Sequence, residues 1–143
     1  MKRLVWILLF VAVRVGSGSS QQTSTNTVPI FVIHGPTIVA FFAPATTKDL
    51  EDDGDSNEAL SDFQFYNGEV SGPLHMAGIE FDEADAQSFR IRIGKTVSTY
   101  GTGKYGIGYF FISPGKKPHF VHGVMTDVDL LDAARKYFGM NIK

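Results

Sequence analysis

Apolar residues between positions 28 and 43 come in two short runs. Residues 28–33 are apolar apart from Pro29 and predict a strand. Because proline cannot donate a hydrogen bond to a neighbouring strand, we expect this strand at the edge of a sheet. Residues 37–43 (TIVAFFA) are β-branched and aromatic with no alternation. This pattern is typical of a strand buried on both faces, as in the middle of an α/β sheet.

A helical spacing of apolar residues follows. We expect a helix to begin near Ser56, where Asp55 and Glu58 can accept hydrogen bonds from the free N–H groups of the first turn. One face of this helix would carry Leu60, Phe63, Asn67 and Val70. Two glycines and a proline within residues 68–73 predict that the helix bends or restarts before it ends at Gly78.

The next part of the chain has the period of a strand. Residues 79–86 predict one strand, and residues 88–93 (SFRIRI) predict the next. Strict alternation there places one set on each face: Phe89, Ile91 and Ile93 against Arg90 and Arg92. Gly94 and Lys95 make a two-residue turn into residues 96–100, which predicts a β-hairpin.

The last third predicts a second hairpin and a closing helix. Residues 107–113 are aromatic and of the buried type, and a Pro-Gly turn leads to a second arm at residues 118–124. Thr126 can cap the last helix, with Asp129 three residues later, and Gly139 ends it. The apolar stripe of this helix is Leu130, Leu131, Ala134 and Phe138. The order β-β-α-β-hairpin-β-β-α indicates a mixed α/β fold.

Residues 1–20 have the layout of a secretory signal peptide. Two basic residues precede an apolar run at residues 4–13, and small residues follow at 16–20. The run is shorter than the roughly 20 residues that span a bilayer. We therefore expect a secreted or periplasmic protein with no membrane span in the mature chain, a polar linker at residues 21–27 and one domain at residues 28–143. Because Arg14 ends the apolar run early, a short anchor or a buried strand is the alternative.

The composition of the chain excludes several kinds of site and partner. The chain has 143 residues, of which 43% are hydrophobic, enough for one domain with a core. It has no cysteine, which excludes disulfides, thiolate chemistry and cysteine-bound metals. A net charge of −2 gives no reason to expect nucleic acid as a partner. Residues 48–85 hold twelve acids and one base, whereas residues 86–143 hold nine bases and three acids, so parts of the surface can differ in sign.

Two segments resemble the thioredoxin-like superfamily. Residues 37–50 are similar to the family's central strand and active-site loop, with Phe41, Phe42 and Ala43 at the strand positions. Residues 106–115 (GIGYFFISPG) resemble the family's Gly-Ile-Pro and the strand after it, followed at Val121 and Gly123 by its closing strand and then by its last helix. The resemblance covers roughly residues 28–139. It implies a thioredoxin-like mixed sheet flanked by helices, with an inserted β-hairpin at residues 88–100 where the family usually has a helix crossing the sheet.

The departures from the family imply a fold without its activity. The two cysteine positions fall on Thr46 and Asp49, and Gly108 stands at the position of the cis-proline. Without a thiolate there is no nucleophile for disulfide exchange. The resemblance therefore implies a protein that is not an enzyme, needs no cofactor and binds a protein or peptide partner. Its groove would be formed by Pro44, Thr46, Thr47, Asp49, Ile107 and Gly108.

An alternative is a small metal-binding or hydrolytic protein that uses the acidic loop at residues 49–57. This loop has oxygen ligands at several positions of a calcium loop, but Leu60 stands where a bidentate glutamate is needed. Four histidines could join such a site, although His119 and His122 would point to opposite faces of a strand. The Gly-x-Gly-x-x-Gly match at residues 101–106 precedes a strand and not the helix that phosphate binding requires.

Overall fold

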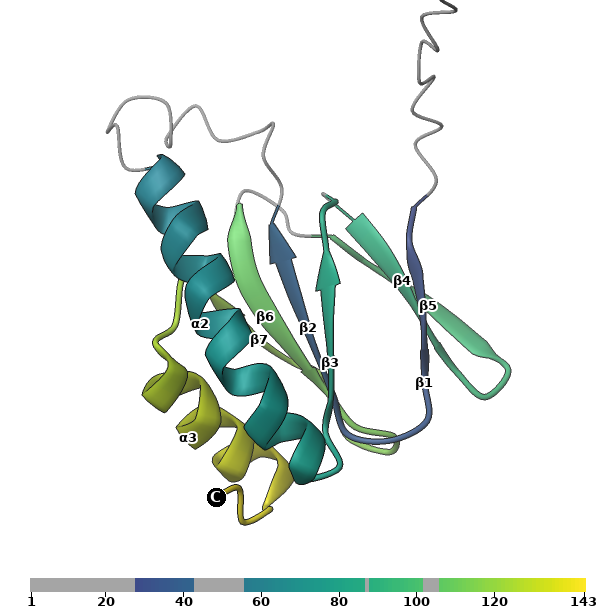
Figure 1. Ribbon diagram of the computed structural model, residues 1–143. Helices are drawn as coiled ribbons and strands as arrows, with labels where there is room; N and C mark the ends of the chain where they lie inside the picture. Colours follow the sequence, from purple (N-terminus) through teal and green to yellow (C-terminus); the bar gives the residue numbers. More distant parts are fainter. Residues whose placement is uncertain (1–27, 43–55, 87, 102–105) are drawn as a thin grey trace, which may run out of the picture.

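A computed structural model describes residues 28–42, 56–86, 88–101 and 106–143 (Figure 1). The predicted signal peptide and linker lie outside these residues. The elements are β1 (Ile30–Ile33), β2 (Thr37–Phe42), α2 (Ser56–Met76), β3 (Glu80–Ala84), β4 (Ser88–Ile93), β5 (Thr96–Gly101), β6 (Ile107–Ile112), β7 (His119–His122) and α3 (Asp127–Phe138). This order confirms the predicted alternation of strands, hairpins and helices.

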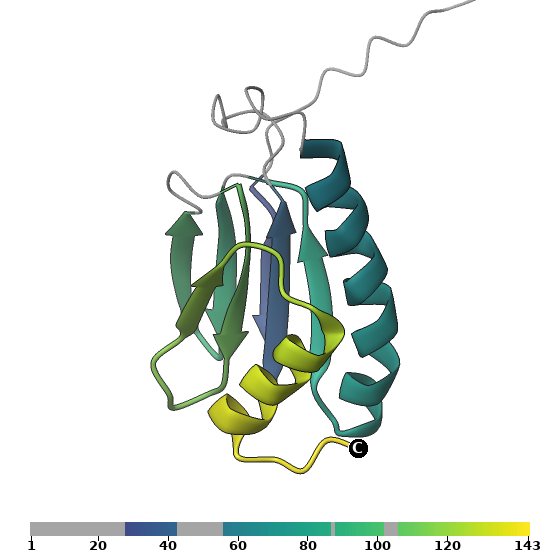
Figure 2. The ribbon, with the colours of Figure 1, turned by 90° about the vertical axis from the view of Figure 1, so that its left-hand side faces the viewer.

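The strands form two sheets in place of the single mixed sheet that was predicted. The central sheet has the order β3-β2-β6-β7, and the outer sheet has the order β1-β4-β5. Figures 1 and 2 show both helices on one face of the central sheet and the outer sheet on its other face. The physical reason lies in the hairpin β4-β5 and in β1, because their apolar faces cover the second face of the central sheet.

Strand β2 is buried on both faces, as its unbroken apolar sequence predicted. It pairs in parallel with β3 and antiparallel with β6, and β6 pairs antiparallel with β7. Ile38 and Ala40 of β2 pack on the helix side, whereas Val39 and Phe41 pack between the two sheets. The predicted core aromatics follow the same rule: Phe41, Tyr109, Phe110 and Phe111 are buried, and Phe42 packs against the helix-side core.

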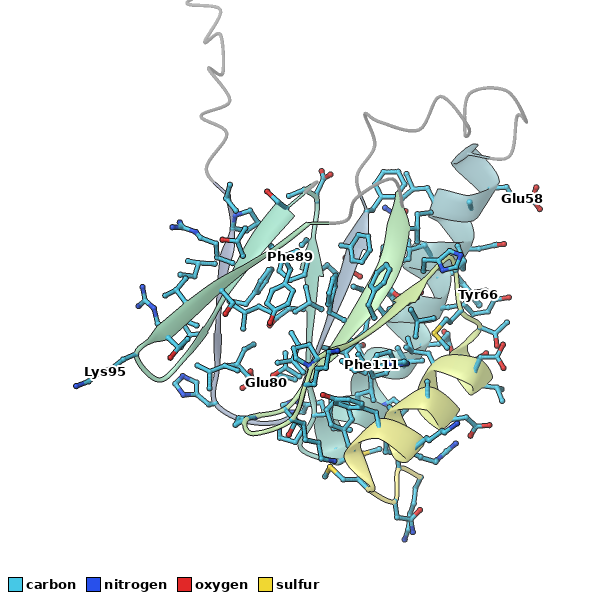
Figure 3. All side chains as sticks on the ribbon, turned by 180° about the vertical axis from the view of Figure 1, so that it is seen from behind. Glu58, Tyr66, Glu80, Phe89, Lys95 and Phe111 are labelled. Atoms are coloured by element: carbon cyan, nitrogen blue, oxygen red, sulfur yellow. The ribbon has the colours of Figure 1, made fainter. Side chains whose placement is uncertain are left out.

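The outer sheet confirms three predictions about its strands. Strand β1 lies at an edge, paired in parallel with β4. Strands β4 and β5 form the predicted hairpin, in which Ile93 lies opposite Thr96 across the two-residue turn. Phe89 and Ile91 face the central sheet and are buried, as the alternation predicted. Figure 3 shows the Phe89 ring between the two sheets.

Helix α2 begins at Ser56 as expected, but the predicted restart within residues 68–73 is wrong. The helix runs as one element through Pro73 to Met76. Pro73 lies in the last turn, so its missing N–H removes a hydrogen bond only near the helix end. Gly78, with φ of 75°, then takes the left-handed conformation that stops the helix, and its N–H donates to the carbonyl of His75.

Helix α3 has both predicted caps. The Thr126 hydroxyl accepts a hydrogen bond from the N–H of Asp129, and Gly139 ends the helix with φ of 68°. Leu130 and Ala134 of the predicted stripe are buried, and Figure 3 shows Phe111 of the central sheet on the side of this helix. The caps therefore fix the two ends of α3, and the stripe fixes the face that it buries; both follow from local sequence.

Candidate interaction surface

The predicted groove is described only in part. Pro44, Thr46, Thr47 and Asp49 lie outside the described residues. Phe42 at the end of β2 lies opposite Ile107 at the start of β6. The two strand ends that would frame the groove are therefore neighbours, as expected. Ile107 and Gly108 are themselves buried: the Ile107 side chain packs into the helix-side core. These two positions therefore contribute structure, and what they expose to a partner is small.

Gly108 has a structural reason to be glycine. A Cβ there would lie 2.5 Å from the carbonyl oxygen of Val121 and 2.9 Å from Cε2 of Phe120. Strand β6 runs between β2 and β7 at this point, and Gly108 lies opposite Phe41 and His122. Gly108, which the resemblance aligned with a cis-proline, is thus an inner-strand glycine closely covered by its neighbours.

Within the described residues, no three His, Asp or Glu side chains lie close enough to hold a metal ion. His119 points to the helix side, where its ring stacks on Tyr137 with 6.1 Å between the centroids. His34 is exposed in the bend between β1 and β2, and His75 is exposed in the last turn of α2. Residues 49–55 of the predicted acidic site lie outside the described residues, so the metal-site alternative receives no support from the described part of the chain.

None of the described helices is both long enough and apolar enough to cross a membrane.

A polar group is buried on the helix side of the central sheet. The Asn67 side chain is 1% exposed, and its Nδ2 donates to Oε1 of Glu83 at 3.0 Å, while its Oδ1 has no hydrogen-bond partner.

Tyr109 is a second buried polar residue on this side, and Ala40 lies between Glu83 and Tyr109 in one row across the sheet. Burial, with a smaller effect from the Glu83 charge, raises the pKa of Tyr109 to about 12. The phenol therefore stays neutral and serves as an acceptor for the N–H of Met125 at 3.5 Å.

The outer sheet presents a second face that no described helix or strand covers (Figure 1). Two rows of directly opposed residues define this surface, which we call the open face: Ile30, Arg90 and Thr99 in one row, and Val32, Arg92 and Val97 in the other. Each arginine thus lies on the middle strand with an aliphatic neighbour from β1. Ile30, Val32 and Val97 are 38%, 45% and 45% exposed, which is high for such side chains.

The charge on the open face has one sign. Its six residues include two arginines and no carboxylate, and within the described residues neither arginine takes part in an ion pair. Nε of Arg90 is buried and has no hydrogen-bond partner. Lys95 extends the positive charge at the tip of the hairpin, as Figure 3 shows. Guanidinium groups beside aliphatic side chains keep part of their surface out of water, which strengthens their interaction with an incoming anion.

Sequence reasoning found the arginines but not the surface. The alternation of residues 88–93 placed Arg90 and Arg92 together on one face, and the excess of bases after residue 86 indicated a positive region. The missing fact was that β1 joins β4 from 60 residues earlier in the chain and brings Ile30 and Val32 beside them. No short-range pattern contains that pairing.

Comparisons with protein-family models, with curated proteins and with solved structures found no match to this chain.

Proposed function

We propose that this chain is an exported, non-catalytic thioredoxin-like domain that binds an acidic segment of a protein partner on its open face. The order β3-β2-β6-β7, with β2 and β3 parallel and both helices on one face, supports the thioredoxin-like part of the proposal. The outer sheet occupies the other face, where the resemblance expects a crossing helix. The signal-peptide layout of the sequence at residues 1–20 supports export.

The observation that carries the binding function is the unpaired arginine pair on the open face. Arginines on an exposed strand ordinarily serve solubility, and in that role they are surrounded by other polar residues. Here Arg90 and Arg92 are flanked by Ile30 and Val32, and no carboxylate of the described residues neutralises them. A surface that combines aliphatic area with arginine has the composition of an interface core. Charge complementarity then favours an acidic partner.

The absence of cysteine supports a binding function without disulfide exchange. Thr46 and Asp49 stand at the two redox positions implied by the resemblance, and the whole chain offers no thiol elsewhere. A domain of this kind can hold an extended partner segment, but it has no group that could form a mixed disulfide with it.

Peptide binding to the mature chain, residues 21–143, tests this function. The probe is a fluorescein-labelled peptide of about eight residues with alternating glutamate and valine, measured by fluorescence anisotropy at about 150 mM salt, where weak surface attractions are screened. The double variant Arg90→Gln, Arg92→Gln is expected to weaken binding at least about tenfold, since two charge-assisted contacts are lost.

The matched control removes the same charge at another place. Lys117 and Lys136 are exposed on the turn before β7 and on α3, and the double variant Lys117→Gln, Lys136→Gln should bind like the parent. Equal weakening by both double variants would mean that only net charge attracts the peptide. No binding by the parent, or parent-like binding by the arginine variant, would overturn the proposed function.

A further inference from the structure

Strand β5 exposes hydrogen-bonding groups along one side. It lies at the edge of the outer sheet, with β4 as its only neighbour among the described strands. Ile93 and Thr96 close the two-residue turn, and in such a hairpin the pair beside the turn exchanges both hydrogen bonds. Because bonded and non-bonded pairs then alternate, Ser98 and Tyr100 face β4 with their backbone groups, whereas Val97 and Thr99 direct their N–H and C=O groups away from it.

Among the four edges of the two described sheets, β5 is the one whose strand is neither very short nor charged. Exposed edges ordinarily carry charges, prolines or very short strands, which prevent another chain from pairing there. Strand β1 has four residues and follows Pro29, β7 has four residues and follows Pro118, and β3 carries three carboxylates in five residues. In contrast, β5 has six residues (TVSTYG) with no charge and no proline.

We infer that the acidic segment binds by adding a strand to the free edge of β5; this inference rests on the proposed function. Neighbouring strands lie about 4.8 Å apart, so an added strand would lie about 10 Å from β4. Arg90 and Arg92 can reach across Thr99 and Val97 over that distance, toward carboxylates on the outer face of the added strand. Its backbone would bond to Val97 and Thr99, which supplies affinity independent of sequence.

The two faces of the added strand meet different surroundings, which defines the partner. Its outer side chains lie beside the open face and would be acidic. Its inner side chains lie beside Tyr100 and Phe120, two half-buried rings that both contact Phe110, at 5.4 and 4.8 Å between centroids. The partner segment is therefore extended and alternates acidic with apolar residues. A second copy of this chain is a poorer occupant, because it would add its own two arginines to the same positive face.

A pair of substitutions at one position separates strand addition from binding to the open face alone. Thr99→Pro removes the outward N–H and leaves the hydrogen bonds to β4 intact, and proline is tolerated on an edge strand in this orientation. Thr99→Val keeps the N–H and changes only the side chain. For the glutamate–valine peptide, we expect Thr99→Pro to weaken binding at least about tenfold, and to weaken it clearly more than Thr99→Val does, because only the proline removes the outward N–H.

Hydrogen exchange of the unsubstituted protein gives an independent measurement. With the peptide bound, the amides of Val97 and Thr99 should gain protection, while those of Ser98 and Tyr100 are already bonded to β4 and should change little. This experiment needs no variant, so it decides the inference even if Thr99→Pro fails to fold.

Four outcomes would overturn strand addition. If the arginine variant loses the peptide while Thr99→Pro binds normally and Val97 gains no protection, the open face binds the partner without β5 and the proposed function stands alone. If the parent does not bind the peptide, both proposals fail. If sedimentation shows a dimer that Thr99→Pro dissociates, the edge of β5 belongs to a second copy of the chain. If single-stranded DNA displaces the peptide completely, the open face belongs to nucleic acid.

Discussion

Phe41 of β2 lies directly opposite Gly108 of β6, and its ring occupies the space that a side chain at position 108 would need. An ideal Cβ on Gly108 would lie 2.7 Å from Cζ of Phe41. The same ring lies 5.6 Å from the rings of both Phe110 and Phe120, measured between centroids. Glycine at position 108 is therefore a condition for the aromatic packing between the two sheets.

Gly108→Ala is expected to destabilise the fold by about 3 kcal/mol, because the added methyl group overpacks the core and also meets the backbone oxygen of Val121. Gly68→Ala is the control. Gly68 is exposed in the middle of α2 with no atom near its missing Cβ, so alanine there should stabilise by about 0.5–1 kcal/mol. Urea unfolding measures both. Equal stability of Gly108→Ala and the parent would contradict the close packing of Phe41 on Gly108.

Local sequence predicted each element but not how the elements combine. The run at residues 37–43 predicted a strand buried on both faces, and Thr126 and Gly139 predicted the ends of α3, because both depend on neighbouring residues only. The parallel pairing of β1 with β4 joins residues about 60 positions apart, and it converts the expected insertion into a second sheet. Pro73 does not interrupt α2, because the cost of a proline depends on its distance from the helix end, which local composition does not give.

The candidate site was predictable to a smaller extent. The resemblance directed attention to Ile107 and Gly108, and these residues proved to be buried parts of β6. Arg90 and Arg92 were placed on one face by their spacing, but whether that face meets water or a core is a property of the layers. Whether a charged strand face can bind a partner depends on the residues beside it. Here these residues are Ile30 and Val32, which come from the distant strand β1.

Of the described tyrosines whose pKa is raised, Tyr109 should lose its proton at the highest pH. Its folded pKa of about 12 lies above the ordinary value of 10, so its contribution to stability is fully present below pH 10 and is lost as the pH rises through about 12. Absorbance at alkaline pH should show one phenol ionising near pH 12, coincident with unfolding. In Tyr109→Phe this late step should disappear, at a cost of about 1 kcal/mol for the lost acceptor of the Met125 N–H. A late step that persists would show that another tyrosine produces it.

Asn67→Leu is expected to match or exceed the parent in stability, by up to about 1 kcal/mol. Leucine has the same branching as asparagine and removes the buried Oδ1 that has no partner, while exposed Glu83 can exchange its lost hydrogen bond for water. Asn67→Ala removes the same polar atoms but leaves a cavity, and should cost about 1–2 kcal/mol. The difference between the two variants in urea unfolding is the test. If leucine costs more than alanine, the polar group at position 67 stabilises the fold through a contact that leucine cannot replace.

Asp82 gives the fold a dependence on pH at the acidic side. It lies on β3 opposite Val39, on the side that faces the outer sheet, and its pKa is raised above the ordinary 3.8 by burial and then by the charge of Glu80. The folded state therefore favours the neutral carboxyl more than the unfolded state does. Its contribution to stability is present below about pH 4 and is lost as the pH rises through the raised pKa.

Asp82→Asn should therefore melt at a higher temperature than the parent at pH 7, and this difference should shrink toward zero at pH 3, where the parent carboxyl is protonated. Glu80→Gln should give a smaller gain in the same direction, because it removes only the second cause of the shift. Asp62→Asn on the exposed side of α2 controls for the loss of one negative charge. Thermal unfolding across this pH range measures all three variants. A gain for Asp82→Asn that is equal at pH 3 and pH 7 would mean that the amide stabilises β3 by a contact of its own, and the carboxyl would not be the titrating group.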